Sequence, residues 1–568
     1  MGAREVDKTC LREPPRGRRS GEGDPARGPR RSSCGATDAR LSLSATPGEA
    51  KLDLMPDAQH QVATDSRGQP RGWATPTAPC PASSPPSLAA TAFGLCPGAT
   101  TSAGARAGLQ HRRTARGRRL GAALGAPTLV LLGCILGSAV AGRADDWPQW
   151  LGPQRDSVWR ETGILDRFPP GGPPVRWRVP IGGGFSGPAV AKGRVYVMDR
   201  TLSPNAAKPA SPFDRGAIPG QERILCLNAT DGRQLWQSSY PCAYTMSYPA
   251  GPRTTPLIHG GKVFTLGGEG NLHCLDAASG RPIWSHDLKR DYHVPTPMWG
   301  FAGHPLLAGN HLICLVGGDG TTVVAFDKDT GQERWRALSA KEPGYAPPTL
   351  IRCEGKTRVV VWDPESVNCL DPATGHLEWT VPFTSRTGLS VATPRQAGDR
   401  LFVTAFYDGS LMLRLTGGQP QVLWQSTKHS ERNTDGLHSL ISTPFLDDGC
   451  VYGVCSYGQL RGLDATTGRR LWETLAATTA DGQETRWANA FLVKNGARYF
   501  LFNEKGDLII AQLSPRGYTE ISRAHLLEPT NPDPGRLVVW SHPAFADRCV
   551  FARNDREIIC ASLAQAAR

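Results

Sequence analysis

The sequence lacks the short cysteine motifs of redox and haem proteins. Although it contains 15 cysteines, no C-x-x-C pair and no C-x-x-C-H motif occurs, which argues against thioredoxin-like chemistry and covalent c-type haem. Cys226, Cys274 and Cys369 share one position of a repeat described below, and Ala325 and Gly462 fill that position in other copies. We interpret it as a small buried core position occupied by a thiol. Metal binding or disulfide pairing is the alternative.

The sequence also lacks a compact basic patch, despite a net charge of +13. Much of the positive excess lies before residue 120, in stretches such as Arg112-Arg113 and Arg116-Gly117-Arg118-Arg119. Since no known nucleic-acid-binding module accompanies these residues, the pattern favours no nucleic-acid partner.

The first 108 residues lack a sustained apolar period and are rich in Pro, Gly, Ala, Arg and Ser. Such a segment buries too little surface to offset its ordering entropy, so we expect disorder. Residues 109–144 differ. A basic stretch, His111 to Arg119, precedes the apolar run Leu120 to Ala141, which ends in Ala139-Val140-Ala141. This order predicts a secretory signal peptide.

Signal peptides begin chains, so the position of this one is unusual. We therefore expect residues 1–108 to be an upstream extension, with translation beginning near residues 109–120 and the mature chain near Gly142. A signal-anchor that tethers the protein to the membrane through residues 120–141 is one alternative. Lipidation within Leu131-Leu132-Gly133-Cys134 is another. All three predict an exported protein of the periplasm or cell envelope.

The strongest feature of the chain is a ten-residue phrase that recurs at regular intervals. It is clearest as LDATTGRRLW at residues 463–472. The other copies are residues 227–236, 275–284, 326–335, 370–379 and, in degenerate form, 415–424. Successive closing tryptophans are 48, 51, 44, 45 and 48 residues apart. A repeat of this length predicts an array of similar supersecondary units.

Each phrase is predicted to be a tight turn between two strands. The Asp or Asn at its second position can accept hydrogen bonds from the next backbone N–H groups, and the Gly at its sixth supplies a positive φ. The Trp of the outgoing strand can wedge between neighbouring units. Two more strand-like runs precede each phrase, and four strands per unit is the pattern of a β-propeller blade.

Counting the units predicts an all-β fold, an eight-bladed β-propeller of four-stranded blades over residues 145–568. The expected starts of the inner strands are Gly187-Pro188, Thr255-Pro256, His304-Pro305, Pro347-Pro348, Thr393-Pro394, Thr443-Pro444, Asn489-Ala490 and His542-Pro543. The seventh unit replaces the phrase with a turn at residues 513–517. The eighth ends after three strands, so we expect the strand around Trp177 to complete it and close the ring. The first unit carries an insertion, Asp199 to Gln221, predicted to be a surface loop.

The opening segment Asp146 to Asp156, DWPQWLGPQRD, together with the LDxxTGxxxW phrases, carries a family resemblance. Over residues 146–568 the chain resembles the PQQ-like (pyrroloquinoline-quinone-type) β-propeller repeat proteins. These include BamB-like outer-membrane assembly factors, planctomycete-type exported propellers and quinoprotein alcohol dehydrogenases. The resemblance implies the fold and selects no single activity.

The residues just before each inner strand are expected to ring one mouth of the central channel, the shared pocket of a propeller. Aromatic faces and guanidinium groups there suit a planar anionic ligand, an extended peptide or a glycan. The alternative is that the aromatics pack between blades and the arginines face solvent. The predicted ligand-binding residues, the funnel ring, are Arg253, Trp299, Tyr345, Arg386, His438, Arg486, Trp487 and Trp540.

Two functions remain open. We favour an exported, non-catalytic binding or scaffold propeller of the cell envelope, without metal or cofactor, whose partner is an envelope protein, a glycan or a small anionic ligand. The alternative is a PQQ-dependent quinoprotein dehydrogenase. For such enzymes the resemblance implies adjacent cysteines in a disulfide ring, and Glu, Asn and Asp around calcium. The sequence has no adjacent cysteines, and only Glu342, Asp435 and Glu484 lie near the expected mouth.

Overall fold

The computed structural model describes residues 145–566, apart from residues 208 and 480. The expectations for residues 1–108 and 109–144 lie outside the described residues. Within the described part, the helices are all too short to cross a bilayer as an apolar span.

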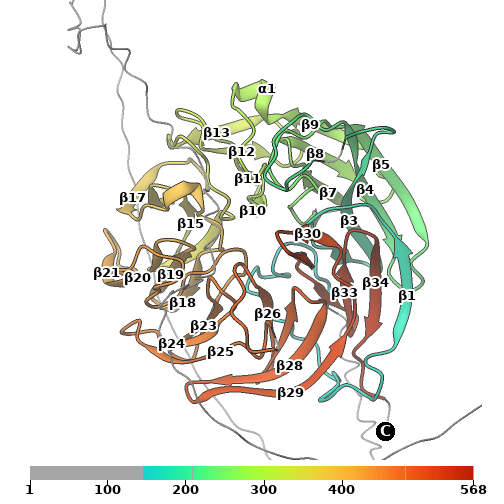
Figure 1. The fold of residues 1–568 in the computed structure, drawn as a ribbon. Helices are drawn as coiled ribbons and strands as arrows, with labels where there is room; N and C mark the ends of the chain where they lie inside the picture. Colours follow the sequence, from blue (N-terminus) through green and yellow to red (C-terminus); the bar gives the residue numbers. More distant parts are fainter. Residues whose placement is uncertain (1–144, 208, 480, 567–568) are drawn as a thin grey trace, which may run out of the picture. The chain divides into compact units, whose positions relative to one another are not determined.

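Eight four-stranded antiparallel sheets are arranged in a ring, so the predicted eight-bladed propeller is confirmed (Figure 1). Every inner strand begins at or directly after a predicted start. Blade 1 comprises β2 (Ala189–Ala191), β3 (Arg194–Leu202), β4 (Gly220–Asn228) and β5 (Gln234–Pro241). Blade 2 comprises β6 (Leu257–His259), β7 (Lys262–Leu266), β8 (Asn271–Asp276) and β9 (Pro282–Asp287). Blade 3 comprises β10 (Leu306–Ala308), β11 (His311–Leu315), β12 (Val323–Asp327) and β13 (Glu333–Ala337). Blade 4 comprises β14 (Thr349–Cys353), β15 (Lys356–Trp362), β16 (Ser366–Leu370) and β17 (Leu377–Pro382).

The remaining blades follow the same order until the last, which takes its outer strand from the start of the described chain. Blade 5 comprises β18 (Arg395–Ala397), β19 (Arg400–Ala405), β20 (Gly409–Arg414) and β21 (Gln421–Gln425). Blade 6 comprises β22 (Phe445–Asp447), β23 (Cys450–Val454), β24 (Leu460–Asp464) and β25 (Arg470–Thr474). Blade 7 comprises β26 (Ala490–Asn495), β27 (Arg498–Asn503), β28 (Asp507–Ser514) and β29 (Gly517–His525). Blade 8 comprises β32 (Ala544–Ala546), β33 (Cys549–Arg553), β34 (Glu557–Ser562) and β1 (Val175–Pro180).

The ring is closed as predicted. Strand β1 pairs with β34 in antiparallel register, with Trp177 opposite Cys560, and the two strands lie side by side in Figure 1 although they come from opposite ends of the described chain. This pairing covers the edge that β34 would otherwise expose, and it ties the two ends of the propeller together.

Five tryptophans connect one blade to the next in the same way. In each case the indole nitrogen donates to the main-chain oxygen of the third phrase residue in the following blade, and the ring covers the phrase glycine. The N–O pairs are Trp177–Ala229 at 3.0 Å, Trp236–Ala277 at 3.2 Å, Trp284–Lys328 at 3.2 Å, Trp335–Pro372 at 3.2 Å and Trp424–Ala465 at 3.1 Å. The predicted wedge between units is therefore confirmed.

The turn chemistry of the phrase is also confirmed. The Asp464 Oδ1 accepts from the backbone N–H groups of Thr466 at 2.8 Å and Thr467 at 2.9 Å, while Gly468 has φ 73°. The cysteines of the repeat, Cys226, Cys274 and Cys369, are free thiols with no exposed surface, as a small core position requires.

The insertion in blade 1 is shorter than predicted. Strand β3 continues to Leu202 and β4 begins at Gly220, with these two residues opposite each other, so only residues 203–219 form a loop. The Pro, Ala and Gly content of the segment suggested a loop, but the residues at its two ends extend the ladder and form an ion pair across it. Asp199 lies opposite Arg223, and the closest oxygen and nitrogen of this ion pair are 2.5 Å apart.

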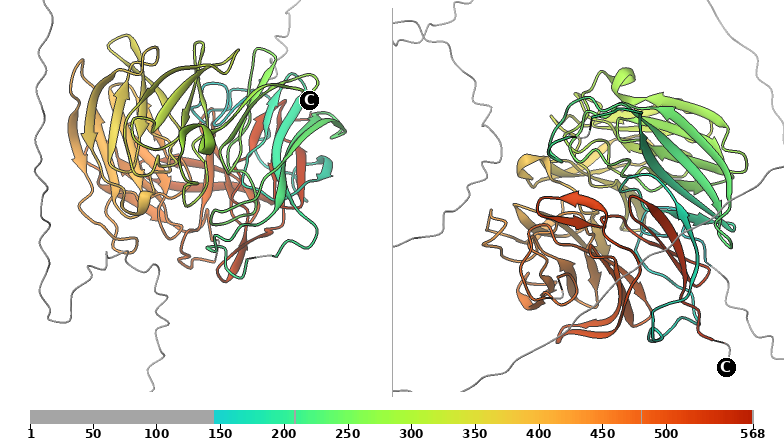
Figure 2. Two further views of the ribbon diagram at one scale, coloured as in Figure 1. Left: turned by 90° about the horizontal axis from the view of Figure 1, so that it is seen from above. Right: turned by 45° about the vertical axis from the view of Figure 1, so that its right-hand side comes forward.

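Two faces of the ring carry different connections. We call one the cap face: it holds the crossovers from each outer strand to the next inner strand and the turns between second and third strands. The turn face holds the other hairpins, including the phrases. Three short elements belong to crossovers: α1 (Leu288–Tyr292), the 3₁₀ turn η1 (Arg386–Gly388) and the hairpin of β30 (Asn531–Asp533) and β31 (Arg536–Val538). The β3–β4 loop and the β30–β31 hairpin project from the same face (Figure 2).

Candidate functional site

Five aromatic rings gather over the channel on the cap face, and we call them the aromatic cap: Phe213, Tyr248, Trp299, Trp487 and Trp540. The Phe213 centroid lies 5.3 Å from Tyr248, 6.0 Å from Trp299 and 6.2 Å from Trp487. Trp540 joins the group through Tyr248, at 5.9 Å. Since Tyr248, Trp299 and Trp487 precede the inner strands of blades 2, 3 and 7, the Phe213 ring from blade 1 must reach across the channel mouth.

Two residues of the aromatic cap have strained backbones. Tyr248 has φ 53° and Trp487 has φ 66°. Bulky residues rarely adopt the left-handed region, at a cost of about 1–2 kcal/mol each, and such conformations cluster at binding and catalytic sites. The fold thus holds two large rings in place at the expense of local stability.

A buried polar chain supports the aromatic cap from below. The Tyr248 hydroxyl donates to Asp533 Oδ1 at 2.8 Å, and Arg536 bridges Asp533 and Glu504, with its Nε 2.9 Å from Glu504 Oε1. Glu504 also accepts from the Trp540 indole nitrogen at 2.8 Å. Burial raises the pKa of both carboxyl groups, and the Arg536 guanidinium opposes that rise. Two of the five rings are therefore oriented by hydrogen bonds: Tyr248 by Asp533 of the β30–β31 hairpin, and Trp540 by Glu504, which is linked to that hairpin through Arg536.

Arg486 presents a cation beside the aromatic cap. Its guanidinium carbon lies 4.4 Å from the centroid of Trp487. Its Nε and Nη2 donate to Glu431 Oε2 at 3.0 and 2.7 Å. Because the ion pair fixes the guanidinium plane, Arg486 and Trp487 form a rigid cation–π unit on the surface.

Two other predicted residues of the funnel ring brace the mouth from inside. Arg253 donates from Nη2 to the main-chain oxygens of Ser247 at 2.8 Å and Tyr248 at 2.7 Å, and burial lowers its pKa. Tyr345 is 3% exposed, accepts from the Trp299 backbone N–H at 3.4 Å and donates to Glu342 at 3.1 Å. Both side chains hold loops that carry aromatic rings of the cap.

The last two lie away from the aromatic cap. Arg386 is 55% exposed and its Nε is 3.1 Å from Asp408 Oδ1, near blade 5. His438 has no exposed surface, its Nδ1 is 3.2 Å from the Phe406 oxygen, and burial lowers its pKa. The structure therefore brings Trp299, Arg486, Trp487 and Trp540 to one surface, and it places Arg386 beside Asp408 near blade 5 and His438 in the blade wall.

The channel beneath the aromatic cap is entered by the opening segment of the propeller. The Trp150 ring stacks on His304 with centroids 3.9 Å apart and meets the edge of His542 at 5.0 Å. Its indole nitrogen donates to Thr393 at 3.0 Å. These partners precede the inner strands of blades 3, 5 and 8, so Trp150 lies in the channel itself. We call residues 147–157 the channel plug.

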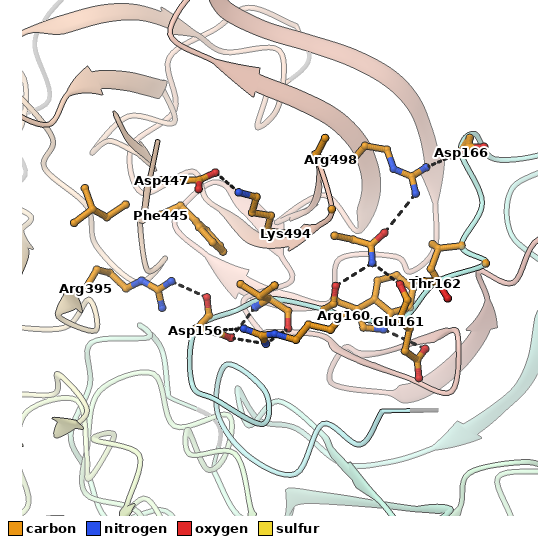
Figure 3. A pocket seen from close by; sticks show the side chains of 18 of the residues that line it. Asp156, Arg160, Glu161, Thr162, Asp166, Arg395, Phe445, Asp447, Lys494 and Arg498 are labelled. Carbon is orange, nitrogen blue, oxygen red and sulfur yellow. Dashed lines mark hydrogen bonds and ion pairs between the residues drawn. The ribbon is translucent and has the colours of Figure 1, made fainter. Parts of the chain in front are cut away.

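A hollow of about 880 Å³ lies on the turn face, between residues 156–166 and blades 5 to 7 (Figure 3). Its cations already have partners: Lys494 pairs with Asp447, Arg160 with Asp156, and Arg498 with Asp166 at 2.7 Å. A charged ligand would therefore have to break an existing ion pair before it could bind a cation of the hollow.

The carboxylates near the mouth do not gather into a cluster in the described part of the chain. Across the described ranges no group of three or more His, Cys, Asp or Glu side chains is placed to share a metal ion. The three carboxylates nearest the expected mouth serve separate partners: Asp435 accepts from Thr427, Glu484 from Gln459 and Glu342 from Tyr345.

Sequence reasoning missed Phe213, Tyr248, Glu431, Glu504 and Asp533. Phe213 had one signal, since it is the only aromatic residue in the loop of residues 203–219. The others gave none, because a carboxylate under a surface ring looks in sequence like any polar loop residue.

Comparisons with known proteins place the chain in a family. The model of the family described as outer membrane protein assembly factor BamB matches residues 220–352 and 319–565, together more than half of the chain. A curated relative, outer membrane protein assembly factor BamB of Yersinia pestis, is 27% identical over 235 residues, or 40% of this chain and 54% of the relative. The chain thus spans about half the length of that relative.

Two solved structures that match the chain are more distant in sequence. BamB from Moraxella catarrhalis is 14% identical, with a TM-score of 0.46 over 68% of this chain and 99% of that one. A europium-containing methanol dehydrogenase is 12% identical, with a TM-score of 0.36 over 73% of this chain and 89% of the other. The family match over the blades is what identifies the protein: the chain belongs to the BamB family of PQQ-like β-propellers.

Proposed function

We propose that this protein is exported to the cell envelope and acts there as a non-catalytic docking propeller. The aromatic cap, with Arg486 beside it, is the surface that holds an envelope protein. The family and the curated relative, both described as outer membrane protein assembly factors, support a scaffold role of this kind.

The observation that carries the proposal is the composition of the cap face. Trp, Tyr and Arg dominate the energetic centres of protein interfaces, because each buries a large area at a small cost in side-chain entropy. Here Trp299, Trp487 and Trp540 are half-buried, so part of each ring faces outward. Leu537, in the adjoining hairpin, is 53% exposed. Covering this apolar surface with a protein partner is more favourable than leaving it exposed to water, and the fixed guanidinium at its edge can bind a polar or acidic group of that partner.

Site-specific crosslinking tests this surface. A photoreactive amino acid at position 537 should crosslink to an envelope protein in growing cells, while the same probe at position 422 should not. Val422 is the matched control, because it is 46% exposed but lies on β21, an outer strand at the rim.

The double variant Arg386→Ala with Trp487→Ala tests the energetics. Loss of an interface tryptophan costs about 2 kcal/mol or more, so crosslinking at position 537 should fall at least tenfold while the melting temperature changes by only a few degrees. Equal crosslinking from positions 537 and 422, or an unchanged yield in the double variant, would refute docking at the aromatic cap.

Other ligands are outcomes of parallel assays. Binding of oligosaccharides or small carboxylates that is lost in Trp487→Ala would replace the protein partner with a glycan or an anion. Turnover of an alcohol with PQQ, calcium and an artificial electron acceptor would restore the dehydrogenase alternative.

A further inference from the structure

The channel plug is hydrogen-bonded to one blade after another. Trp147 exchanges two 2.8 Å hydrogen bonds with Val190 of blade 1, and the Pro148 oxygen accepts from the Ile258 backbone nitrogen of blade 2 at 2.8 Å. The later contacts are Arg155 to the Pro305 and Pro348 oxygens at the starts of blades 3 and 4, at 3.0 and 3.4 Å, Arg395 of blade 5 to the Asp156 oxygen at 2.6 Å, and Ser157 to the Leu492 oxygen of blade 7 at 2.7 Å. The position of the plug is therefore fixed by the ring around it.

The backbone of the channel plug is strained where it bends. Leu151, Arg155 and Ser157 have φ of 59°, 55° and 59°. Residues with side chains rarely adopt this left-handed region, and they stay there only where surrounding contacts over-determine the backbone. Because Leu151 directly follows Trp150, the Trp150 ring is held in place by the contacts of the plug and not by a local preference of the chain.

The Trp150 ring packs against the two crossovers that carry tryptophans of the aromatic cap. It is 9% exposed, stacks on His304 with centroids 3.9 Å apart and meets the edge of His542 at 5.0 Å. His304 ends the crossover into blade 3, which carries Trp299. His542 ends the crossover into blade 8, where it follows Trp540 by two residues. A ring below the channel mouth therefore supports two rings above it.

Hydrogen bonds join these two crossovers around the channel. The Ser541 hydroxyl donates to the Ser186 oxygen at 3.1 Å. The Ser186 hydroxyl donates to the Thr254 oxygen at 2.7 Å, and the backbone nitrogen of the next residue, Thr255, donates to His304 Nδ1 at 2.9 Å. This chain of contacts runs from the start of blade 8 through blades 1 and 2 to blade 3. Since the Trp150 ring packs at both ends of the chain, its loss should disturb both crossovers together.

We propose that Trp150 is a positioning residue of the aromatic cap: its ring supports the crossovers into blades 3 and 8 and so fixes Trp299 and Trp540 for the docked partner. Trp150 acts through His304 and His542, not through contact with the partner. The role in docking rests on the proposed function, but the support of the cap can be measured without any partner.

Fluorine NMR of the protein expressed from the full chain tests this support. 4-Fluorophenylalanine at position 213 reports on the cap, because the Phe213 ring lies 5.3 to 6.2 Å from the rings of Tyr248, Trp299 and Trp487 and is sensitive to their ring currents. Trp150→Leu should shift or broaden its resonance. Trp150→Phe keeps a ring against His304 and should bring the resonance most of the way back to its wild-type position.

Trp159→Leu is the matched control. Trp159 also belongs to the opening segment and is 1% exposed, but its ring packs on Phe500 of blade 7 and Phe545 of blade 8, with centroids 5.4 and 5.1 Å away. Both leucine variants should melt several degrees below the wild type, and only Trp150→Leu should change the fluorine resonance. An unchanged resonance in Trp150→Leu, or an equal change in Trp159→Leu, would refute the positioning role.

Thr393→Val is a milder variant that decides the case if Trp150→Leu does not fold. It removes the acceptor of the 3.0 Å hydrogen bond from the Trp150 indole nitrogen and leaves the ring in place. We expect a smaller shift in the same direction as that of Trp150→Phe, since both variants lose this hydrogen bond. A wild-type resonance in Thr393→Val would contradict the proposal.

Crosslinking from position 537 in cells separates this inference from the proposed function. Trp150→Leu should lower the yield about tenfold, as the loss of an interface tryptophan does, while Trp159→Leu should leave it unchanged. A wild-type protein that does not crosslink refutes docking, and the fluorine resonance still decides the positioning of the cap. Full crosslinking by a Trp150→Leu protein whose resonance has shifted would overturn the role of Trp150 in docking.

Discussion

Replacing Gly280 with Ala should reveal how the blades are held together. A Cβ at Gly280 would lie 2.5 Å from the Cε3 of Trp236, and the residue has φ 73°. The left-handed conformation costs an alanine about 1–2 kcal/mol, and pushing the indole aside adds about 1–3 kcal/mol of overpacking. We expect Gly280→Ala to lower the free energy of unfolding by about 2–5 kcal/mol in all.

Gly260→Ala separates the two contributions. Gly260 has φ 57° but nothing within 4 Å of the position of a Cβ, so its substitution should cost only the conformational 1–2 kcal/mol. Trp236→Ala alone should cost about 3–5 kcal/mol, since the ring is buried and its hydrogen bond to Ala277 is lost with it.

In the Trp236→Ala background, Gly280→Ala should cost no more than Gly260→Ala, because the ring that obstructs the new methyl group is gone. The double-mutant cycle should therefore show about 1–3 kcal/mol of coupling. Urea unfolding followed by far-UV circular dichroism measures all four proteins without relying on tryptophan fluorescence. Strict additivity, or equal costs at Gly280 and Gly260 in the wild type, would refute the wedge as the contact that sets blade spacing.

Three further outcomes are expected. Arg553→Met should lower the free energy of unfolding by about 3 kcal/mol or more in urea titrations. The buried guanidinium of Arg553 donates to two main-chain oxygens in or next to blade 1, at 2.8 and 2.6 Å, and both oxygens would lose their partner. An unchanged free energy of unfolding would contradict that role. Burial lowers the pKa of His542 to about 4, against 6.5 for a solvent-exposed histidine. The unfolded chain therefore takes up a proton first as the pH falls, and the free energy of unfolding should decrease by up to about 3 kcal/mol between pH 6.5 and pH 4. The melting temperature of His542→Gln should decrease less over that range. Thiol reagents should label the half-exposed Cys353 in the native protein and leave Cys226, whose pKa burial raises to about 11, unlabelled until the protein unfolds.

The parts of the fold that were predictable depend on local sequence. The phrase containing Asp464 and Gly468 forms a turn because one side chain caps it and one residue accepts φ 73°, and both facts can be read over ten residues. The sequence contains eight such units, and the eighth has only three strands. The strand around Trp177 could therefore be predicted to supply its fourth strand and close the ring.

The candidate site was predictable only where it follows the strand count. Trp299, Trp487 and Trp540 directly precede inner strands, so their places followed from the blade pattern. Phe213 did not, because the path of a 17-residue loop depends on what it packs against, here three rings from other blades. His438 precedes a strand as well, but its ring turns into the blade wall toward the Phe406 oxygen.

The sequence by itself determined the number of blades, their turns and the strand that seals the circle, since each depends on residues a few positions apart that repeat along the chain. Only the tertiary structure decided that Phe213 covers the mouth of the channel and that Trp150 packs beneath it against His304 and His542. Those contacts join residues far apart in sequence, and their free energy comes from burying rings against several blades at once, which no local pattern records.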